Sequence, residues 1–305
     1  MPMKWHKLGR IVEPNPGLPW MRSHAMVPIA DRVEGDIYRL YFSGRDDINR
    51  SCIGYALLDI RRARVLEISR EAVLLPGELG CFDDNGVTPS WIVNDGAGKK
   101  HLYYIGWRPR STTRMSVVAG LALSADGGST FTRASRAPIL RLTNAEPFSI
   151  LTAPCVLRDG GRWRMWYVSG TGWVHADLPR YNIKYAESPD GVDWKQTGHV
   201  CIEAESQDET SLARPCVVSD DRVYRMWYST KKGGRSYRIG YAESADGLTW
   251  NRMDHEAGID VSDSGWDSEM IEYPFVFAHE GRRYMLYNGN DYGRNGAGLA
   301  VCEEP

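Results

Sequence analysis

The chain has 305 residues, and its 37 Lys and Arg are nearly balanced by 39 Asp and Glu, so its formal net charge is −2. This near balance gives no global positive field to gather nucleic acid, and we expect no nucleic-acid partner. No apolar run reaches the ~18 residues that a spanning helix needs, which predicts a protein without a membrane span.

An internal repeat of about 60 residues organises the chain. Each copy begins at a proline that is followed by apolar or β-branched residues. The spacing from one such proline to the next is nearly constant along the chain. These prolines are Pro28, Pro89, Pro154, Pro215 and Pro274.

Each repeat predicts four short strands in chain order. The first contains the proline, and the second is aromatic and closes on a tyrosine at a nearly constant distance from that proline. A third strand contains an alanine, and Asp-Gly turns then lead to an aromatic fourth strand. The tyrosines are Tyr41, Tyr104, Tyr167, Tyr228 and Tyr287; the alanines are Ala56, Ala122, Ala186, Ala242 and Ala300; the aromatic residues after the turns are Phe131, Trp194 and Trp250.

Four-stranded units of this length are typical of propeller blades, so we expect an all-β fold with five antiparallel blades. The fifth repeat contains only three strands, and the segment 4–8 before the first repeat reads as a fourth strand. Trp5 stands as far before Pro28 as Phe131 stands before Pro154. The N-terminal strand is therefore expected to complete the last blade and close the ring, making residues 1–305 a single domain.

The first strands of such blades line a central channel, and polar residues gather at one end of it. They lie just before the repeat prolines and just after the repeat tyrosines. Several carboxylates crowded in a partly desolvated funnel repel one another, so that one stays protonated while another stays ionised. Such a pair is what cleavage of a glycosidic bond requires, and exposed Trp faces suit sugar rings.

The repeats and their phrases resemble the five-bladed propeller superfamily of glycoside hydrolase families 32, 43, 62, 68 and 130. The phrase S-x-D-G-x-x-W and the M-W-Y-S strands are typical of it. The chain is more closely similar to glycosidase-like proteins of bacterial surface-polysaccharide gene clusters. The phrases that carry this second resemblance are Ser23-His24-Ala25, 41–46, 82–86 and 265–268.

The resemblance implies an enzyme acting on a carbohydrate, with inversion as its default outcome, but the acids are placed differently here. Family 43 enzymes have an Asp on each of the first two blades and a Glu on the third. This chain has His24 on the first blade, keeps Asp83 and Asp84 on the second, and has no carboxylate at the matching third position. The acids lie instead on the fourth and fifth blades.

From this pattern we predict roles for two sets of residues. Asp83 or Asp84 together with Glu209 are expected to supply the acid and base. The candidate catalytic residues are Asp83, Asp84, Glu209, Asp267 and Glu269, and the candidate substrate-binding residues are His24, Arg45, Asp46, Trp107, Trp173, His175, Arg214, Glu272 and Asn290. Structural alternatives remain open: Glu209 with Arg214, or Arg45 with Asp46, as ion pairs.

The expected chemistry needs no organic cofactor, and no metal site is predicted, because H-E-x-x-H, Cys/His and nucleotide-binding motifs do not occur. Asp126, Asp190 and Asp246 are expected to stabilise the repeated turns. Six cysteines without C-x-x-C pairing predict buried thiols, and the segment from Met1 to Pro14 lacks the features of a signal peptide, so we expect a cytoplasmic protein. Two other functions remain open: a phosphorylase or glycosyltransferase, and a non-catalytic carbohydrate-binding propeller.

Overall fold

The computed structural model describes residues 3–96, 98–220 and 223–303. Within them the chain is almost entirely β, and consecutive strands pair antiparallel. Among these residues, no helix is long and apolar enough to cross a membrane.

The strands form four-membered groups in the order of the repeats. The first group is β2 (Ser23–Glu34), β3 (Ile37–Arg45), β4 (Ser51–Asp59) and β5 (Arg64–Ile68); the second is β6 (Val87–Asn94), β7 (Lys100–Pro109), β8 (Met115–Ser124) and β9 (Thr132–Arg133). The third is β10 (Ile150–Asp159), β11 (Arg162–His175), β12 (Leu178–Ser188) and β13 (Lys195–Ile202); the fourth is β14 (Glu209–Asp220), β15 (Val223–Lys232), β16 (Arg238–Ser244) and β17 (Asn251–Arg252).

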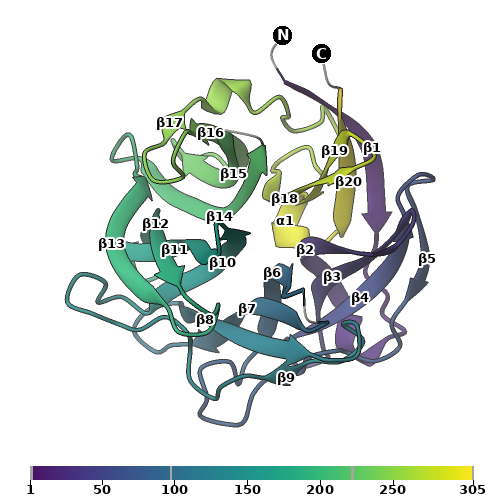
Figure 1. Ribbon diagram of the computed structural model, residues 1–305, viewed down its shortest axis with the longest axis horizontal. Helices are drawn as coiled ribbons and strands as arrows, with labels where there is room; N and C mark the ends of the chain where they lie inside the picture. Colours follow the sequence, from purple (N-terminus) through teal and green to yellow (C-terminus); the bar gives the residue numbers. More distant parts are fainter. Residues whose placement is uncertain (1–2, 97, 221–222, 304–305) are drawn as a thin grey trace.

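The last group joins the two ends of the chain. It consists of β18 (Glu272–His279), β19 (Arg282–Asn288), β20 (Ala297–Glu303) and β1 (Lys4–Val12), with β1 antiparallel to β20. Three short helices, η1 (Pro19–Met21), η2 (Asp254–Glu256) and α1 (Asn290–Gly293), lie in connections. Figure 1 shows β1 and β20, the first and last strands of the chain, side by side in this sheet.

The groups are arranged around a common centre, with the first strand of each group innermost (Figure 1). Each of β2, β6, β10, β14 and β18 lies against the next, and β18 lies against β2. Short parallel bridges join the third strand of one group to the first strand of the next, as between Tyr181 and Ser211. Backbone pairing therefore runs on through the second, third and fourth groups as one 12-stranded sheet.

The repeated turns hold neighbouring groups together. Asp126 accepts hydrogen bonds from the backbone N–H groups of Ser129 and Thr130, and Asp190 and Asp246 do the same in their own turns. A glycine of each turn has a left-handed backbone, which an L side chain rarely adopts. Its carbonyl accepts a hydrogen bond from an aromatic residue of the preceding group, as Gly247 does from Trp166 at 2.8 Å. The structural role predicted for these aspartates is confirmed.

Small side chains allow the innermost strands to pack closely. The Val217 N–H lies 3.2 Å from Cys155 Sγ, and the Val276 N–H lies 3.0 Å from Cys216 Sγ. All six cysteines are free, and Cys155 and Cys216 are buried, as predicted. These thiols therefore act as compact packing groups between the innermost strands of neighbouring groups.

Candidate functional site

A pocket of about 100 Å³ lies where the innermost strands begin. The residue directly before the repeat proline lines it in four of these strands, as Val27, Ala153, Arg214 and Tyr273. Aromatic residues from second and third strands complete the lining, chiefly Trp107, Tyr181 and Tyr237. The pocket therefore gathers residues from separate repeats, at the end of the strands that the sequence predicts.

The four pre-proline residues share an unusual backbone. Their φ angles are +51°, +49°, +53° and +56° in chain order, although a residue before proline prefers an extended conformation. Each belongs to an irregularity in the pairing of its strand with the second strand. Backbone of this kind costs about 1–3 kcal/mol per residue and collects at functional sites, where a bulge re-aims a side chain.

Arg214 is the buried cation of this pocket. It is 1% exposed, and its guanidinium lies about 6 Å from the ring centres of Trp91 and Phe275. Its Nε and Nη2 have no hydrogen-bond partner among the described residues, and Nη1 reaches only the Pro215 carbonyl at 3.5 Å. Burial lowers the pKa of Arg214. The ion pair with Glu209 that the sequence left open does not form.

Glu272 is the buried carboxyl group beside the pocket. It is 0% exposed, and neither carboxyl oxygen has a hydrogen-bond partner among the described residues. Burial raises the pKa of Glu272 well above its ordinary value, although the Tyr273 hydroxyl and the Lys231 ammonium oppose the shift. The negative form of Glu272 would in turn raise the pKa values of Tyr273 and Tyr181. Glu272 is therefore a buried neighbour of the tyrosines that line the pocket, and burial shifts its equilibrium towards the protonated form.

Two tyrosine hydroxyls meet at the pocket, whose lining is otherwise largely apolar. The Tyr181 and Tyr237 hydroxyls lie 2.6 Å apart, and burial raises the pKa values of both. These phenols stay protonated, so they can donate hydrogen bonds to a ligand. They stand at the starts of third strands, a position that the sequence places at the same end of the sheet but from which it named no residue.

A second carboxyl group lies in α1, which reaches the rim of the pocket because the ring of Tyr292 contacts that of Tyr237. Asp291 and Tyr292 both have left-handed backbones, with φ of +58° and +57°. Asp291 is exposed, and Figure 1 shows α1 near the centre of the ring beside β2. The negative charges of Glu272 and Asp291 both raise the pKa of Tyr292, after burial, so this tyrosine connects the two carboxyl groups.

His24 lies close to Arg45 and to Asp291, whose charges act on it. Burial and the positive charges of Arg45 and Arg294 lower the pKa of His24 to about 4, against the opposing charge of Asp291. Burial and the positive charge of Arg114 lower the pKa of Arg45. Cations from separate segments therefore approach one another around the pocket.

The low pKa of His24 predicts a pH dependence of stability. The native imidazole stays neutral down to about pH 4, whereas an unfolded histidine takes up a proton below about pH 6.5. The free energy of unfolding should therefore rise with pH across this window. Urea unfolding of His24→Gln should have a flatter pH profile there, and an unchanged profile would contradict the low pKa.

Three predicted catalytic carboxylates lie instead within ion pairs that fix the chain before a first strand. Asp83 Oδ2 accepts hydrogen bonds from Arg133 Nε at 2.7 Å and from the Tyr104 hydroxyl at 2.9 Å. Asp267 Oδ2 does so from Lys7 Nζ at 2.8 Å and from the Tyr287 hydroxyl at 3.1 Å. In both cases the cation belongs to the outermost strand of the same sheet.

Glu209 repeats this arrangement in the fourth group of strands. Arg252 of β17 contacts its two oxygens at 2.9 and 3.0 Å, and Thr230 donates a further hydrogen bond at 2.7 Å. Hydrogen bonds to Arg252, the Glu205 N–H and Thr230 lower the pKa of Glu209 although burial opposes them. Neither Glu209 nor Asp83 nor Asp267 lines the pocket.

The other predicted residues divide between rim and surface. Trp107 lines the pocket, and Trp173 packs against the apolar residues that surround it. Asp84 faces Arg108 at 3.4 Å, and Asp46 pairs with Arg50 at 3.0 Å rather than with Arg45. Glu269 and His175 are exposed. Asn290 is buried, and it holds the preceding loop by accepting hydrogen bonds from the backbone N–H groups of Glu269 and Met270.

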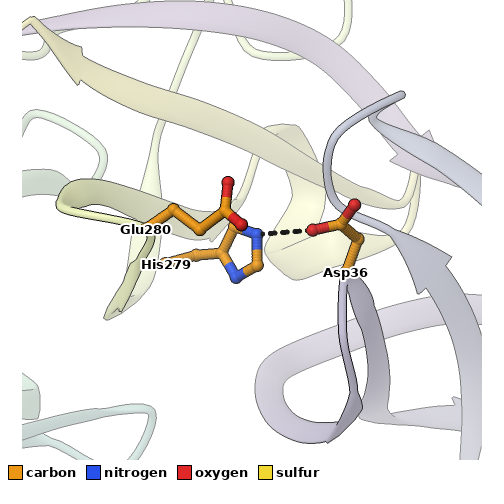
Figure 2. A group of neighbouring side chains, drawn as sticks. All are labelled: Asp36, His279 and Glu280. Atoms are coloured by element: carbon orange, nitrogen blue, oxygen red, sulfur yellow. Dashed lines mark hydrogen bonds and ion pairs between the residues drawn. The ribbon is translucent and has the colours of Figure 1, made fainter.

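A separate cluster lies at the opposite ends of the inner strands (Figure 2). His279 Nε2 lies 3.0 Å from Asp36 Oδ1, and Glu280 is beside them, so the three could hold a metal ion. Arg61, however, contacts Asp36 at 2.9 Å and Glu280 at 3.1 Å, and Tyr38 contacts the other ring nitrogen of His279. A cation would have to displace Arg61, so the cluster acts as an ion network between the first and last sheets.

Two curated proteins of Mycobacterium tuberculosis are similar over the whole chain. They are the uncharacterized proteins MT1551 (strain CDC 1551 / Oshkosh) and Rv1502 (strain ATCC 25618 / H37Rv). Each is 47% identical over 304 residues, which cover 99% of this chain and 100% of the relative. No family model matches the chain.

Solved structures with a similar fold are glycoside hydrolases. The BT0996 complex with RGII has a TM-score of 0.79 at 19% identity, covering 100% of this chain and 93% of the other. A thermostable family-43 glycoside hydrolase gives 0.66 at 17% identity, with 95% and 91% covered. The Bombyx mori GH32 beta-fructofuranosidase BmSUC1 gives 0.65 at 14%, with 94% and 63% covered. At these identities the likeness is one of fold, and it confirms the predicted resemblance at that level.

Proposed function

Since the chain belongs to the same family as the Rv1502 protein of Mycobacterium tuberculosis and has the fold of glycoside hydrolases, we propose that it is an enzyme that cleaves a glycosidic bond. The reaction takes place in the pocket where the innermost strands begin. The similar structure of BT0996 is a complex with an RGII glycan, which supports a carbohydrate substrate for this chain. A cytoplasmic enzyme acting on a surface-polysaccharide type of glycan fits this proposal.

The proposed architecture is a single five-bladed propeller that spans the chain. The five inner strands contact one another in sequence and β18 contacts β2, which supports a closed ring. The pairing of β1 with β20 supports closure by the N-terminal strand, because β1 covers an edge that would otherwise be open. In such a ring the pocket lies on the axis and takes residues from several blades.

Glu272 is the observation that carries the proposal. A carboxyl group that is protonated near neutral pH can donate its proton to the leaving oxygen of a glycoside. Glu272 fits this requirement because it is fully buried, and burial raises its pKa well above the ordinary value against the smaller effects of Tyr273 and Lys231. Glu272 itself does not line the pocket, so its proton would pass to the hydroxyl oxygen of Tyr273 while that hydroxyl gives its own proton to the leaving oxygen, and the phenol stays neutral throughout.

Asp291 is the proposed second carboxyl group. Its side chain is exposed at the rim, so water can reach it, and its carboxylate could accept a proton from an attacking water. Opposite surroundings thus give one carboxyl group the role of acid and the other that of base. His24 and Arg45, close to Asp291, would orient the sugar.

Phosphorolysis is the second candidate function. Arg45, Arg114 and Arg294 lie near one another at the rim, and guanidinium groups suit phosphate. The same acid could then act while phosphate replaces water as the attacking group. The remaining alternative, a non-catalytic carbohydrate-binding propeller, predicts binding with no turnover.

Product analysis by NMR separates these functions. Wild type and Glu272→Gln would be incubated with bacterial glycans and aryl glycosides, with and without phosphate. We expect free sugar from wild type and none from Glu272→Gln, and the first anomer to appear reports inversion or retention. Sugar phosphate would establish phosphorolysis. Sugar binding without any product, in protein that is fully folded, would contradict the enzymatic proposal.

A further inference from the structure

Arg214 lacks a counter-charge in the described part of the protein. No described carboxylate forms an ion pair with it, and the groups that affect its pKa most, after burial, are the thiols of Cys155 and Cys216. Glu209, which lies five positions earlier, is occupied by Arg252. Burying a cation without a partner costs several kcal/mol, so native proteins seldom do so without a purpose.

The free atoms of Arg214 form a particular shape. Nε and Nη2 lie on one edge of the planar guanidinium, and both lack partners among the described residues. The remaining contact, from Nη1 to the Pro215 carbonyl, uses the other side. Two parallel N–H groups on one edge match two oxygens of a carboxylate or a phosphate.

The surroundings hold this edge in position. Trp91 of β6 and Phe275 of β18 lie near the guanidinium, so its apolar neighbours come from two other groups of strands. Arg214 is among the residues that line the pocket, and its backbone is strained, with φ of +53°. Apolar neighbours also lower the local dielectric, which strengthens an interaction with an incoming anion.

More positive charge surrounds the entrance. Arg45 is half-buried, and its own contacts are Asn49 and Met26 rather than a carboxylate. Arg114 and Arg294 bring further positive charge to this rim, where they act on Arg45 and His24. A chain with a formal charge of only −2 therefore concentrates cations at its pocket, which would attract an anionic ligand.

We propose that the pocket selects a sugar carrying an anionic group, and that the Nε and Nη2 edge of Arg214 binds that group in a bidentate manner. This inference rests on the proposed function and adds the substrate class to it. The shared chemistry is an anion with two oxygens, which a uronic acid supplies as a carboxylate and a sugar phosphate supplies as a phosphoryl group. Both nitrogens are buried, so the Arg214 side chain has to turn this edge towards the pocket for the anion to reach it.

Binding of free sugars tests this without any turnover, because free sugars have no glycosidic bond. Calorimetric titration would compare glucuronate, galacturonate and mannuronate, and the 6-phosphates of the parent sugars, with the neutral sugars. The proteins would be wild type, Arg214→Met, Arg214→Lys and the control Arg158→Met. Arg158 is an exposed arginine on β10, outside the pocket.

We expect at least one acidic sugar to bind wild type about 10-fold or more tightly than its neutral counterpart. Arg214→Met should weaken that binding by ~10- to 100-fold, as the loss of charged hydrogen bonds does. Arg214→Lys keeps the charge but not the fork and should recover part of the affinity, while Arg158→Met should match wild type. Preference for uronates identifies a carboxylate, and preference for sugar phosphates identifies a phosphoryl group.

Equal binding of acidic and neutral sugars, including no binding of either, would overturn the inference, as would a preference that survives in Arg214→Met. Thermal unfolding checks the variant, since removing an unpaired buried cation should leave it at least as stable as wild type. Acid binding through Arg214 without turnover of any glycoside would uphold this inference and refute the proposed function. Turnover of neutral glycosides alone would uphold the proposed function and refute this inference.

Discussion

Glu272→Gln is expected to abolish most turnover while leaving the protein folded and at least as stable. Glutamine has the same shape but no acidic proton, so turnover should fall by about 10²- to 10⁴-fold, the usual contribution of a general acid. The measurement is kcat on any glycoside that wild type cleaves. The matched control is Asp84→Asn, a half-buried carboxylate that faces Arg108 outside the pocket.

The same variant should change how stability depends on pH. The native pKa of Glu272 is raised, so above about pH 4.5 the unfolded chain releases a proton that the native protein keeps. The stabilisation that protonated Glu272 contributes is fully present below about pH 4.5, and the free energy of unfolding falls as pH rises towards the native pKa. Glu272→Gln removes the decline, so its advantage over wild type should grow with pH. An identical pH profile in both proteins would argue against a protonated Glu272.

Glu209→Gln is expected to have the opposite outcome, with a large loss of stability. The Glu209 side chain is 1% exposed and Arg252 is 11% exposed, and the change leaves this arginine without its bidentate partner. Breaking a buried pair in this way costs up to about 3–5 kcal/mol, and the contact that Arg252 keeps with Asp254 at 2.6 Å offsets part of it, against the roughly 5–15 kcal/mol that usually holds a domain together. Urea unfolding at constant pH measures the loss.

Activity separates a structural from a catalytic Glu209. Where the folded fraction of Glu209→Gln is measured, its turnover per folded molecule should stay within a few-fold of wild type. A variant that unfolds like wild type but has lost turnover would restore the catalytic role that the sequence predicts for Glu209. The pair of substitutions, at positions 209 and 272, therefore distinguishes the two assignments directly.

The repeats are readable in the sequence because the fold places equivalent residues at equal spacing. The proline columns and the aromatic strands predict each group of strands, and Trp5 marks β1 as the partner of β20. The Asp-Gly turns are equally clear, since their side chains bond within a few residues. Local geometry of this kind depends on short stretches of sequence, which is why pattern alone predicts it.

The site is harder to predict because distance along the chain does not tell which way a side chain points. Asp83 and Glu209 stand six positions before the repeat proline and turn towards the outermost strand, whereas Glu272 stands two positions before it and lies behind the pocket. The spacing is visible in the sequence, but the left-handed residue next to the proline, which redirects the side chains, is not.

Pairing partners from the outer edge of a sheet are also out of reach of sequence patterns. Arg133 and Arg252 lie on outermost strands, 50 and 43 residues from the carboxylates that they neutralise. The sequence around Asp83 or Glu209 does not indicate that an arginine pairs with its carboxylate. Tyr181 and Tyr237 escape prediction for a related reason, because strand tyrosines resemble core residues until their hydroxyls are seen to meet.

The ionisation state of Glu272 in the free protein tests the central claim most directly. Infrared difference spectra between wild type and Glu272→Gln isolate this one carboxyl group, and they can be recorded from about pH 4 to about pH 9. We predict that the band of the protonated carboxyl group persists at about pH 7, because the pocket leaves Glu272 buried and without a partner among the described residues. A carboxylate band that is already complete near pH 5 would show an ordinary, ionised glutamate and would contradict its assignment as the acid.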